Sequence, residues 1–427
     1  MCPSPNVISE VSLAELMERP EWNDWRWQMC NRIRTPGQLE RLFHTQPMSP
    51  GVAAAAERFP MAVTPYYASL IREFASSDPV FQMCVPQGRE CIDPPYLTSD
   101  PLGEDADMPV PGLVHRYPDR ALLLATTVCG AYCRHCTRKR LAGQQESVVT
   151  AANLRQATAY LSAHPEISDV IVSGGDPLTM ATPALERVLA AVRGVPSVEV
   201  IRIGTRCPAV LPMRITEELV EMLRRYHPVY VNTQFNHPAE LTQQAAEACG
   251  RLADAGIPLG NQSVLLRGVN DDPRTLEALF RGLLRSRVRP YYLFQCDLVR
   301  GVEHFRTPLS RGIEIMEYLR GRLGGLAIPT FVVDAPHGGG KIPILPSYIV
   351  SVSPTHTVLR NSRGVLVAYP EPMDAESSPT RVDETVSAAG VWELATGQSW
   401  KIEPSHSLRK KRRIVRRLQP VGQLALL

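Results

Sequence analysis

The chain has 427 residues, of which 44% are hydrophobic and 21% are charged. These proportions are close to those of globular proteins, and they exclude wholesale disorder. The formal net charge of +3 is too small to indicate nucleic acid or an anionic membrane as a partner.

The first thirty residues lack the apolar run of about 7–15 residues that a secretory signal requires. No window of the sequence approaches the ~18 apolar residues of a membrane span. We therefore expect a cytoplasmic protein without a membrane partner. In that reducing compartment, the ten cysteines do not indicate five disulfides.

Three regions are predicted in chain order: a helical N-terminal extension at 1–115, an α/β barrel core at 116–343, and a C-terminal β meander with a basic tail at 344–427. The helices expected in the extension are Ser12–Met17, Asp24–Ile33, Pro36–Phe43 and Thr64–Phe74. The strands expected in the meander are Tyr348–Val352, Thr357–Arg360 and Gly364–Tyr369. The basic run at 409–417 is interpreted as a solvated helix face rather than a site for an acidic partner.

The core region alternates short apolar runs, rich in β-branched residues, with longer amphipathic segments. The predicted strands are Ala121–Thr127, Asp169–Ser173, Val198–Ile203, Val229–Thr233, Pro258–Leu265, Arg289–Gln295 and Pro329–Val333. The predicted helices are Ala151–Ser162, Pro183–Val192, Thr216–Tyr226, Thr242–Ala255, Arg274–Arg285 and Ser310–Leu323. Continuous apolar strands separated by helices indicate a parallel sheet. Six or seven such units predict a full or partial α/β barrel, and an open doubly wound sheet is the alternative.

Three cysteines lie within eight residues, directly after the first predicted barrel strand. Cys129, Cys133 and Cys136 have the spacing C-x3-C-x2-C. Three thiolates on one tight loop, with no fourth close in sequence, are typical of a [4Fe–4S] cluster with one open iron. Zinc prefers four protein ligands, or three and a water. The spacing resembles the signature of radical S-adenosylmethionine enzymes, in which that cofactor binds the open iron.

A glycine-rich turn, Gly174-Gly175-Asp176-Pro177, follows the second predicted strand. Such glycines permit close approach of the backbone to a ligand, and Asp176 can accept hydrogen bonds from an ammonium. In radical enzymes of this type, the equivalent turn holds the amino group of S-adenosylmethionine. The turn is a weak signal by itself, but its place one unit after the cysteine loop strengthens it.

Lys341 ends a second glycine-rich segment, after the last predicted strand. A Walker A loop is excluded, because position 335 is Ala and position 342 is Ile. The lysine is either a solvated loop residue or a Schiff-base lysine for pyridoxal phosphate. Only five lysines could hold that cofactor; three lie in the tail, and Lys139 lies in a cationic patch beside the cysteines. Lys341 is the remaining candidate.

With both motifs in hand, the chain resembles the lysine 2,3-aminomutase family, radical S-adenosylmethionine enzymes that also use pyridoxal phosphate. The similarity runs from about Trp22 to Pro372, through blocks such as HRYPDR, YCRHCTR, RIGTR, GNQSVLLRGVND and PTFVVDAP. It implies a partial α/β barrel, a homo-oligomer and an electron donor such as flavodoxin or ferredoxin. It also implies that a basic L-amino acid, foremost L-lysine, is converted into its β-isomer.

The resemblance further implies which residues contact the cofactors. These are Cys129, Cys133 and Cys136 for the cluster, Gly174, Gly175, Asp176 and Gln262 for S-adenosylmethionine, and Tyr117, Arg120 and the Schiff-base Lys341 for pyridoxal phosphate. For the substrate, Arg138 would bind the carboxylate through two parallel hydrogen bonds.

Asp297 and Asp334 match the carboxylates that hold the side-chain ammonium of the substrate. Both come just after a barrel strand, one unit apart, so they can converge on a cation. Two carboxylates repel each other unless a cation lies between them. The alternative interpretation is that each aspartate caps the element that follows its strand.

The sequence departs from the family pattern at several positions. No structural zinc site is expected, because the loop at Gly268–Asp272 lacks a cysteine and none follows Cys296. Gln234 stands where His is common and His337 where Gly is common, which leaves open a shifted substrate pocket.

Other activities remain to be weighed. Arginine is the alternative substrate, because two carboxylates serve a guanidinium as well as an ammonium. Glutamate is disfavoured, because Asp297 and Asp334 would repel its side chain. A homologue that modifies a lysine-tRNA factor is disfavoured by the long extension and tail. An iron–sulfur redox protein without turnover would have no use for Lys341 or the aspartate pair.

Overall fold

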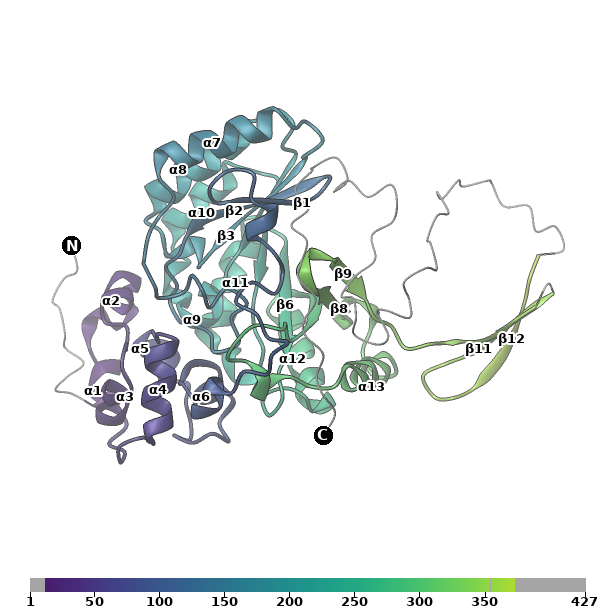
Figure 1. Ribbon diagram of the computed structural model, residues 1–427, viewed down its shortest axis with the longest axis horizontal. Helices are drawn as coiled ribbons and strands as arrows, with labels where there is room; N and C mark the ends of the chain where they lie inside the picture. The colour runs from purple at the N-terminus through teal and green to yellow at the C-terminus, as the bar shows by residue number, and fades with distance from the viewer. Residues whose placement is uncertain (1–11, 354, 373–427) are drawn as a thin grey trace, which may run out of the picture. The chain divides into compact units, whose positions relative to one another are not determined.

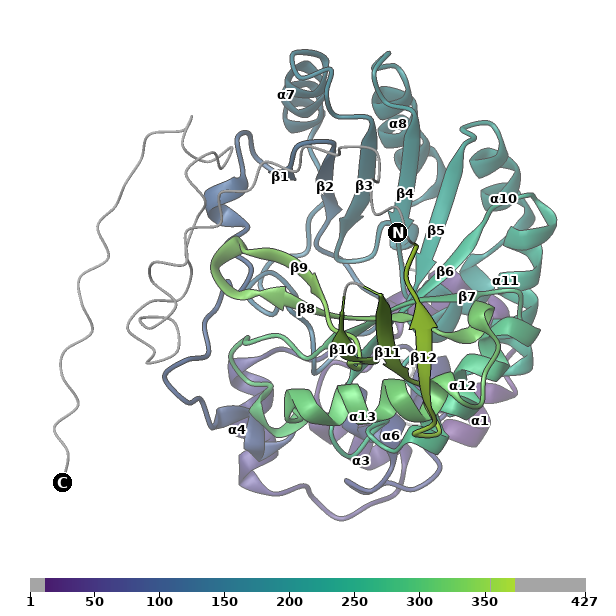
Figure 2. The same ribbon diagram turned by 90° about the vertical axis from the view of Figure 1, so that its right-hand side faces the viewer.

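The computed structural model describes residues 12–353 and 355–372, so the basic run at 409–417 lies outside the described residues. Its centre is a curved sheet of nine strands, and neighbouring strands in the sheet are also successive in the chain (Figure 2). The strands are β1 Leu113–Tyr117, β2 Arg120–Thr126, β3 Asp169–Gly174, β4 Val200–Gly204, β5 Val229–Thr233, β6 Leu259–Leu265, β7 Arg289–Gln295, β8 Thr330–Ala335 and β9 Gly340–Pro343.

Strands β2 to β8 are all parallel, whereas β1 and β9 at the two ends are antiparallel to their neighbours. This succession without reversal is that of a partial α/β barrel, so the predicted fold is confirmed and the doubly wound alternative is wrong. The two antiparallel end strands were not predicted, because each belongs to a hairpin next to a glycine- or proline-containing turn.

Helices cover the outer side of the sheet (Figure 2). They are α7 Ala151–Ser162, α8 Thr182–Arg193, α10 Glu217–Arg224, α11 Gln243–Asp254, α12 Pro273–Arg285 and α13 Leu309–Arg320. Thr150, Thr216 and Thr242 each accept a hydrogen bond from the first helical turn that follows, which fixes where the helix begins. The apolar face of each helix is buried against the strands in one continuous core.

The described part of the N-terminal extension contains six short α-helices, which Figure 1 shows side by side with the barrel. They are α1 Leu13–Met17, α2 Trp25–Cys30, α3 Pro36–Leu42, α4 Pro50–Arg58, α5 Pro65–Ala68 and α6 Pro79–Cys84. Helices α4 and α6 were missed, and the helix predicted at Thr64–Phe74 ends early. There the Ser69 hydroxyl donates to the carbonyl of Tyr66 and competes with the helical pattern. The extension shares the core of the barrel.

The predicted C-terminal meander is a three-stranded sheet, with β10 Ile349–Val352, β11 His356–Arg360 and β12 Leu366–Pro370 in that order. Each strand lies within two residues of its prediction. The division of the chain into three regions at 115 and 343 stays a prediction. Among the described helices, none has the length and apolar character needed to cross a bilayer.

Candidate functional site

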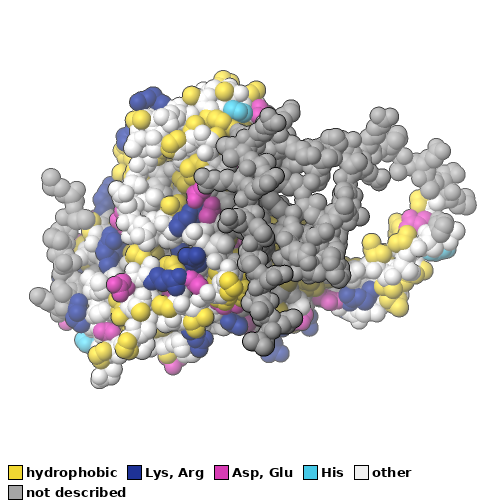
Figure 3. Space-filling view, viewed as in Figure 1, with side chains coloured by type: hydrophobic (Ala, Val, Ile, Leu, Met, Phe, Trp, Pro, Cys, Tyr) yellow, Lys and Arg dark blue, Asp and Glu magenta, His cyan; other side chains and the backbone are white. Residues whose placement is uncertain are grey.

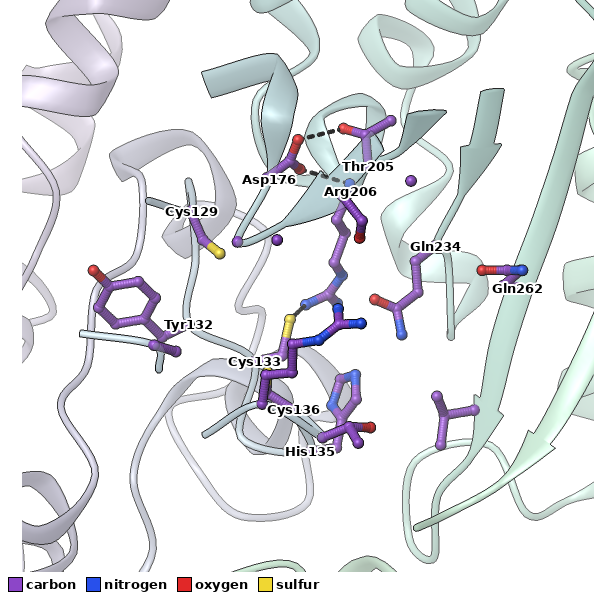
Figure 4. Close-up of a pocket in the computed structure, with 18 of the residues that line it drawn as sticks. Cys129, Tyr132, Cys133, His135, Cys136, Asp176, Thr205, Arg206, Gln234 and Gln262 are labelled. Carbon is purple, nitrogen blue, oxygen red and sulfur yellow. Dashed lines mark hydrogen bonds between the residues drawn. The ribbon is translucent and has the colours of Figure 1, made fainter. Parts of the chain in front are cut away.

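A cavity of about 310 Å³ opens at the carboxyl ends of the parallel strands (Figure 4). This edge is where barrel folds position reactive groups. Most of the predicted site residues line the cavity, namely Cys129, Cys133, Cys136, Arg138, Gly174, Gly175, Asp176, Gln262, Asp297, Asp334 and Lys341. Tyr117 and Arg120 do not.

The three cysteines lie on the loop after β2, with Cys133 and Cys136 joined by a turn in which the Cys136 N–H donates to the Cys133 carbonyl at 3.1 Å. Burial raises the pKa of the Cys129 and Cys136 thiols, the latter to about 11, so a bound metal must displace their protons. In the described part of the chain, no three His, Cys, Asp or Glu side chains converge closely enough to ligate a single metal ion.

A buried carboxylate fixes the cysteine loop to the N-terminal extension. Glu90 accepts hydrogen bonds from Arg134 at 2.6 and 2.9 Å and from Lys139 at 2.8 Å. Arg134 also donates to the carbonyls of Phe59 and Pro60, and Lys139 to the carbonyl of Gly301. Lys139 is therefore buried in an ion pair rather than part of an open cationic patch. No local sequence signal could have joined residues so far apart in the chain.

The glycine turn after β3 packs against the start of the cysteine loop. The Gly175 N–H donates to the carbonyl of Thr126 at 2.6 Å, and the Asp176 N–H to that of Val128 at 2.7 Å. A Cβ atom at Gly174 would lie 2.2 Å from the Thr126 carbonyl oxygen, and one at Gly175 would lie 2.4 Å from that of Val128. These glycines are therefore required because the two backbone segments approach each other closely, and not only to admit a ligand.

The Asp176 carboxylate is held by the chain itself. It accepts hydrogen bonds from the Leu178 N–H at 3.0 Å, the Thr205 hydroxyl at 2.7 Å and the Arg206 N–H at 2.7 Å. Burial still raises its pKa above the ordinary value. As placed, the side chain orders the turn, and its predicted contact with S-adenosylmethionine stays a prediction.

Arg206, just after β4, is a site residue that sequence reasoning missed. Its Nη1 lies 2.7 Å from the sulfur of Cys133 (Figure 4). Its Nη2 donates to Glu240 at 2.7 Å and to the Tyr67 hydroxyl at 2.8 Å. The only available signal was the block RIGTR, which contains both Arg206 and the end of its strand.

Lys341 and the two aspartates also line the cavity. Lys341 lies on β9, Asp334 on β8 and Asp297 just after β7. The Lys341 ammonium donates to both carboxylate oxygens of Asp334, at 2.8 and 3.0 Å. Asp297 accepts a hydrogen bond from the Thr137 hydroxyl at 2.7 Å. Burial, and then the charge of Asp334, raise the pKa of Asp297 to about 7. The pair of carboxylates is thus close enough to interact and has a cation beside it.

Arg138 is bound to an internal carboxylate. Its Nε lies 3.1 and 3.0 Å from the two oxygens of Glu104, and its Nη2 lies 2.6 Å from one of them. Arg140 also donates to Glu104, at 3.2 Å. Arg138, which was predicted to bind the substrate carboxylate, is therefore held by Glu104 through its Nε and Nη2 atoms, and it also lines the cavity.

Tyr117 is the last residue of β1, an end strand of the sheet, and Arg120 is the first residue of the neighbouring β2. The Tyr117 hydroxyl accepts a hydrogen bond from the backbone N–H of Lys341 at 2.9 Å, and the Arg120 guanidinium stacks 3.8 Å from the centre of the Tyr117 ring. Gln262, on β6, lines the cavity. Gln234, where the sequence has Gln in place of the more common His, lines it too. The contacts predicted for these residues with cofactors stay predictions.

Two family models match the chain. The model for lysine-2,3-aminomutase matches residues 316–423, and that for the radical SAM superfamily matches residues 123–279. The L-lysine 2,3-aminomutase of Clostridium subterminale is 48% identical over 399 residues, which cover 92% of this chain and 96% of that protein. The enzyme of the same name from Fusobacterium nucleatum is 47% identical, over 96% of this chain and 95% of its own length.

More distant likenesses were also found. The glutamate 2,3-aminomutase of Clostridioides difficile is 43% identical over 348 residues, which cover 81% of this chain and 82% of that protein. Among solved structures, Streptococcus suis SuiB bound to S-adenosylmethionine matches with a TM-score of 0.40 and 13% identity, over 51% of each chain.

Proposed function

The chain belongs to the lysine 2,3-aminomutase family of radical S-adenosylmethionine enzymes, and from this premise we propose that it moves the α-amino group of a basic L-amino acid from C2 to C3. L-Lysine, which would give L-β-lysine, is the foremost substrate. What carries this proposal is that the cysteine loop, Lys341 and two aspartates line one cavity.

The residues of the cavity fit the cofactors that the family uses. Three thiols on one loop suit a [4Fe–4S] cluster with an open iron, and a single lysine, Lys341, lines the same cavity. When bound, the cluster and S-adenosylmethionine supply a hydrogen-abstracting radical, and pyridoxal phosphate supplies the carbonyl that carries the migrating nitrogen. Cys129, Cys133 and Cys136 would hold the cluster, and Lys341 would hold the pyridoxal phosphate.

The side chains of the cavity then bind and orient the substrate. Arg138 presents a guanidinium, which suits a carboxylate through parallel hydrogen bonds. Asp334 already accepts an ammonium in this cavity, that of Lys341, so it is able to accept the ammonium of a lysine substrate. Because Asp297 lies beside Asp334, a bound cation would also favour the ionised form of Asp297.

The same pair of carboxylates could bind a guanidinium, so arginine is the second candidate substrate. Glutamate remains disfavoured for the charge of its side chain, and the glutamate enzyme is less similar to this chain than the two lysine enzymes described above. An electron carrier without turnover leaves Lys341 and the aspartates without a role.

An anaerobic competition assay tests the proposal. The reconstituted protein receives dithionite, S-adenosylmethionine and equal amounts of lysine and arginine, and the β-amino product is identified by mass. We expect β-lysine, with none from Lys341→Ala. A β-arginine product alone would favour the second candidate, and turnover of neither amino acid would contradict the proposal. If pyridoxal phosphate gives no visible absorbance change when it is added to the protein, the result would favour the electron carrier.

We further propose a cytoplasmic homo-oligomer that receives electrons from flavodoxin or ferredoxin. Exposed apolar side chains on the C-terminal sheet support self-association, among them Ile349, Val352, Leu366 and Tyr369. On the face shown in Figure 3, basic and acidic side chains are interspersed over the described surface. Size measurement in solution would test the oligomer, and reduction by each purified donor would test the electron source.

A further inference from the structure

Arg206 connects the cysteine loop to three other parts of the site. Its backbone N–H binds Asp176 of the glycine turn, and its guanidinium binds Cys133, Tyr67 of the extension and Glu240 after β5. The side chain is buried. In Figure 4 the guanidinium extends from the Asp176 side of the cavity to the sulfur of Cys133.

The partners of Arg206 are themselves fixed. Glu240 is fully buried, and its second carboxylate oxygen accepts the backbone N–H groups of Asn236 and His237 at 2.6 and 3.0 Å. The Tyr67 hydroxyl donates to Glu240 at 2.9 Å while it accepts from Arg206. Because Nη2 is tied to both groups, Nη1 is directed at the Cys133 sulfur and cannot turn away without breaking a buried ion pair.

The contact distinguishes one thiol from the other two. In the described ranges, no comparable side-chain donor reaches the sulfur of Cys129 or Cys136. Hydrogen bonds to ligand sulfurs and nearby charge are principal determinants of iron–sulfur reduction potentials. One electron converts [4Fe–4S]²⁺ to [4Fe–4S]⁺ and adds negative charge to the ligand sulfurs. A buried guanidinium beside a sulfur therefore stabilises the reduced form more than the oxidised form.

We propose that Arg206 is a positioning residue for Cys133 and raises the reduction potential of the cluster, which makes the cluster easier for a low-potential one-electron donor to reduce. The inference rests on the proposed function only in that the three cysteines bind a [4Fe–4S] cluster.

The experiment is a redox titration of the anaerobically reconstituted full chain, followed by electron paramagnetic resonance, with dithionite as reductant and without other cofactors or substrate. We expect Arg206→Gln to lower the midpoint potential by about 59 mV, which is a tenfold loss in the one-electron equilibrium constant. Arg206→Lys should fall between this variant and the native protein. Arg214→Gln is the matched control, because Arg214 is also buried but donates to the carbonyls of Leu178 and Met180.

An unchanged potential in Arg206→Gln at full iron content would overturn the inference, as would an equal fall in Arg214→Gln. If the Arg206 variants assemble no cluster, the native protein labelled with ¹⁵N only in its arginine guanidinium groups decides. A ¹⁵N hyperfine coupling to the reduced cluster supports the contact, and its absence overturns it. A native protein that passes these tests but converts neither lysine nor arginine would contradict the proposed function alone.

Discussion

Asp334 and Lys341 are direct cross-strand partners in the antiparallel pair β8–β9, and the ammonium of Lys341 lies 2.8 and 3.0 Å from the two carboxylate oxygens of Asp334. The strand ladder fixes this pairing, so the amine cannot react with a carbonyl until it leaves Asp334. The residue proposed to bind the substrate ammonium is thus the one that holds the amine before cofactor and substrate arrive.

Two substitutions should separate the roles of this pair. Lys341→Ala should abolish the visible absorbance that pyridoxal phosphate gives on binding, while the iron content stays unchanged. Asp334→Asn should keep that absorbance but raise the KM for lysine about tenfold or more, because a charge-assisted hydrogen bond contributes about 1.5–3 kcal/mol. Asp254→Asn, at an exposed ion pair, is the control and should leave the absorbance and the KM unchanged. A native KM in Asp334→Asn would contradict its proposed role.

Asp297 should make the stability of the cofactor-free protein depend on pH. Burial and Asp334 raise its pKa from 3.8 to about 7. A raised pKa means that the folded state holds the proton more tightly. The contribution of Asp297 to stability is therefore complete below pH 3.8 and is lost as the pH rises through about 7. Asp297→Asn should remove this loss, because Asn is always neutral.

The measurement is urea unfolding of both proteins at pH 5 and pH 8. Relative to the native protein, Asp297→Asn should gain stability at pH 8, by at most about 4 kcal/mol for a shift of this size, and much less at pH 5. An equal change at the two pH values would show that the carboxyl group does not titrate as described.

Arg138→Lys should weaken substrate binding, because a lysine cannot form the two parallel hydrogen bonds of a guanidinium. We expect a rise in KM of about 10–100-fold, equivalent to 1.5–3 kcal/mol. Arg140→Lys is the matched control, since Arg140 also binds Glu104 but does not line the cavity. Steady-state kinetics of both variants would check this, and equal effects would mean that Arg138 serves only to bind Glu104.

Glu90→Gln should destabilise the protein and release the cluster. The substitution leaves Arg134 and Lys139 as buried cations without their anion, which costs about 3–5 kcal/mol. The iron content per chain and the midpoint temperature of thermal unfolding should both fall. Glu277→Gln removes a surface ion pair with Arg281 and should cost less than about 1 kcal/mol. A full iron content in Glu90→Gln would show that the extension is not needed to hold the cysteine loop.

Gly175→Ala should disrupt the cysteine loop, because the new Cβ would lie 2.4 Å from the carbonyl oxygen of Val128, one residue before Cys129. Such a contact forces one backbone segment to move. We expect reduced iron uptake during reconstitution, measured per protein chain. Gly324→Ala is the control, since its Cβ would have no neighbour within 4 Å. Equal iron uptake by both variants would refute the packing argument.

Local patterns predicted most of the barrel. β5, β7 and α7 begin and end at the predicted residues, because β-branched residues mark β5, aromatic residues mark β7 and Thr150 marks the start of the helix. Helix α4 was missed, because its run of alanines carries no amphipathic pattern and its first residue, Pro50, resembles a loop residue. Even so, proline is common at the first position of a helix, so Pro50 could have indicated where α4 begins.

The site divides in the same way. The cysteines and Lys341 stand in short motifs. Their spacing identified the cysteines, and the glycine-rich loop together with the small number of lysines identified Lys341. Glu90 and Arg134 are 44 residues apart, and Arg206 and Cys133 are 73 apart, so only the fold brings them together. Asp176 and Arg138 were predicted to bind ligands. In the structure each side chain is also held by other residues of the chain, Asp176 by Arg206 and Arg138 by Glu104, and no sequence motif indicates these pairs.

The hydrogen bond from the Lys341 N–H to the Tyr117 hydroxyl joins β9 to β1, the two ends of the nine-stranded sheet. Every other pair of neighbouring strands is joined by a ladder. Among the described residues no ladder joins β9 to β1, so we expect the barrel to open first between these two strands. Opening of the barrel at this point would therefore move Lys341, the residue proposed to bind pyridoxal phosphate.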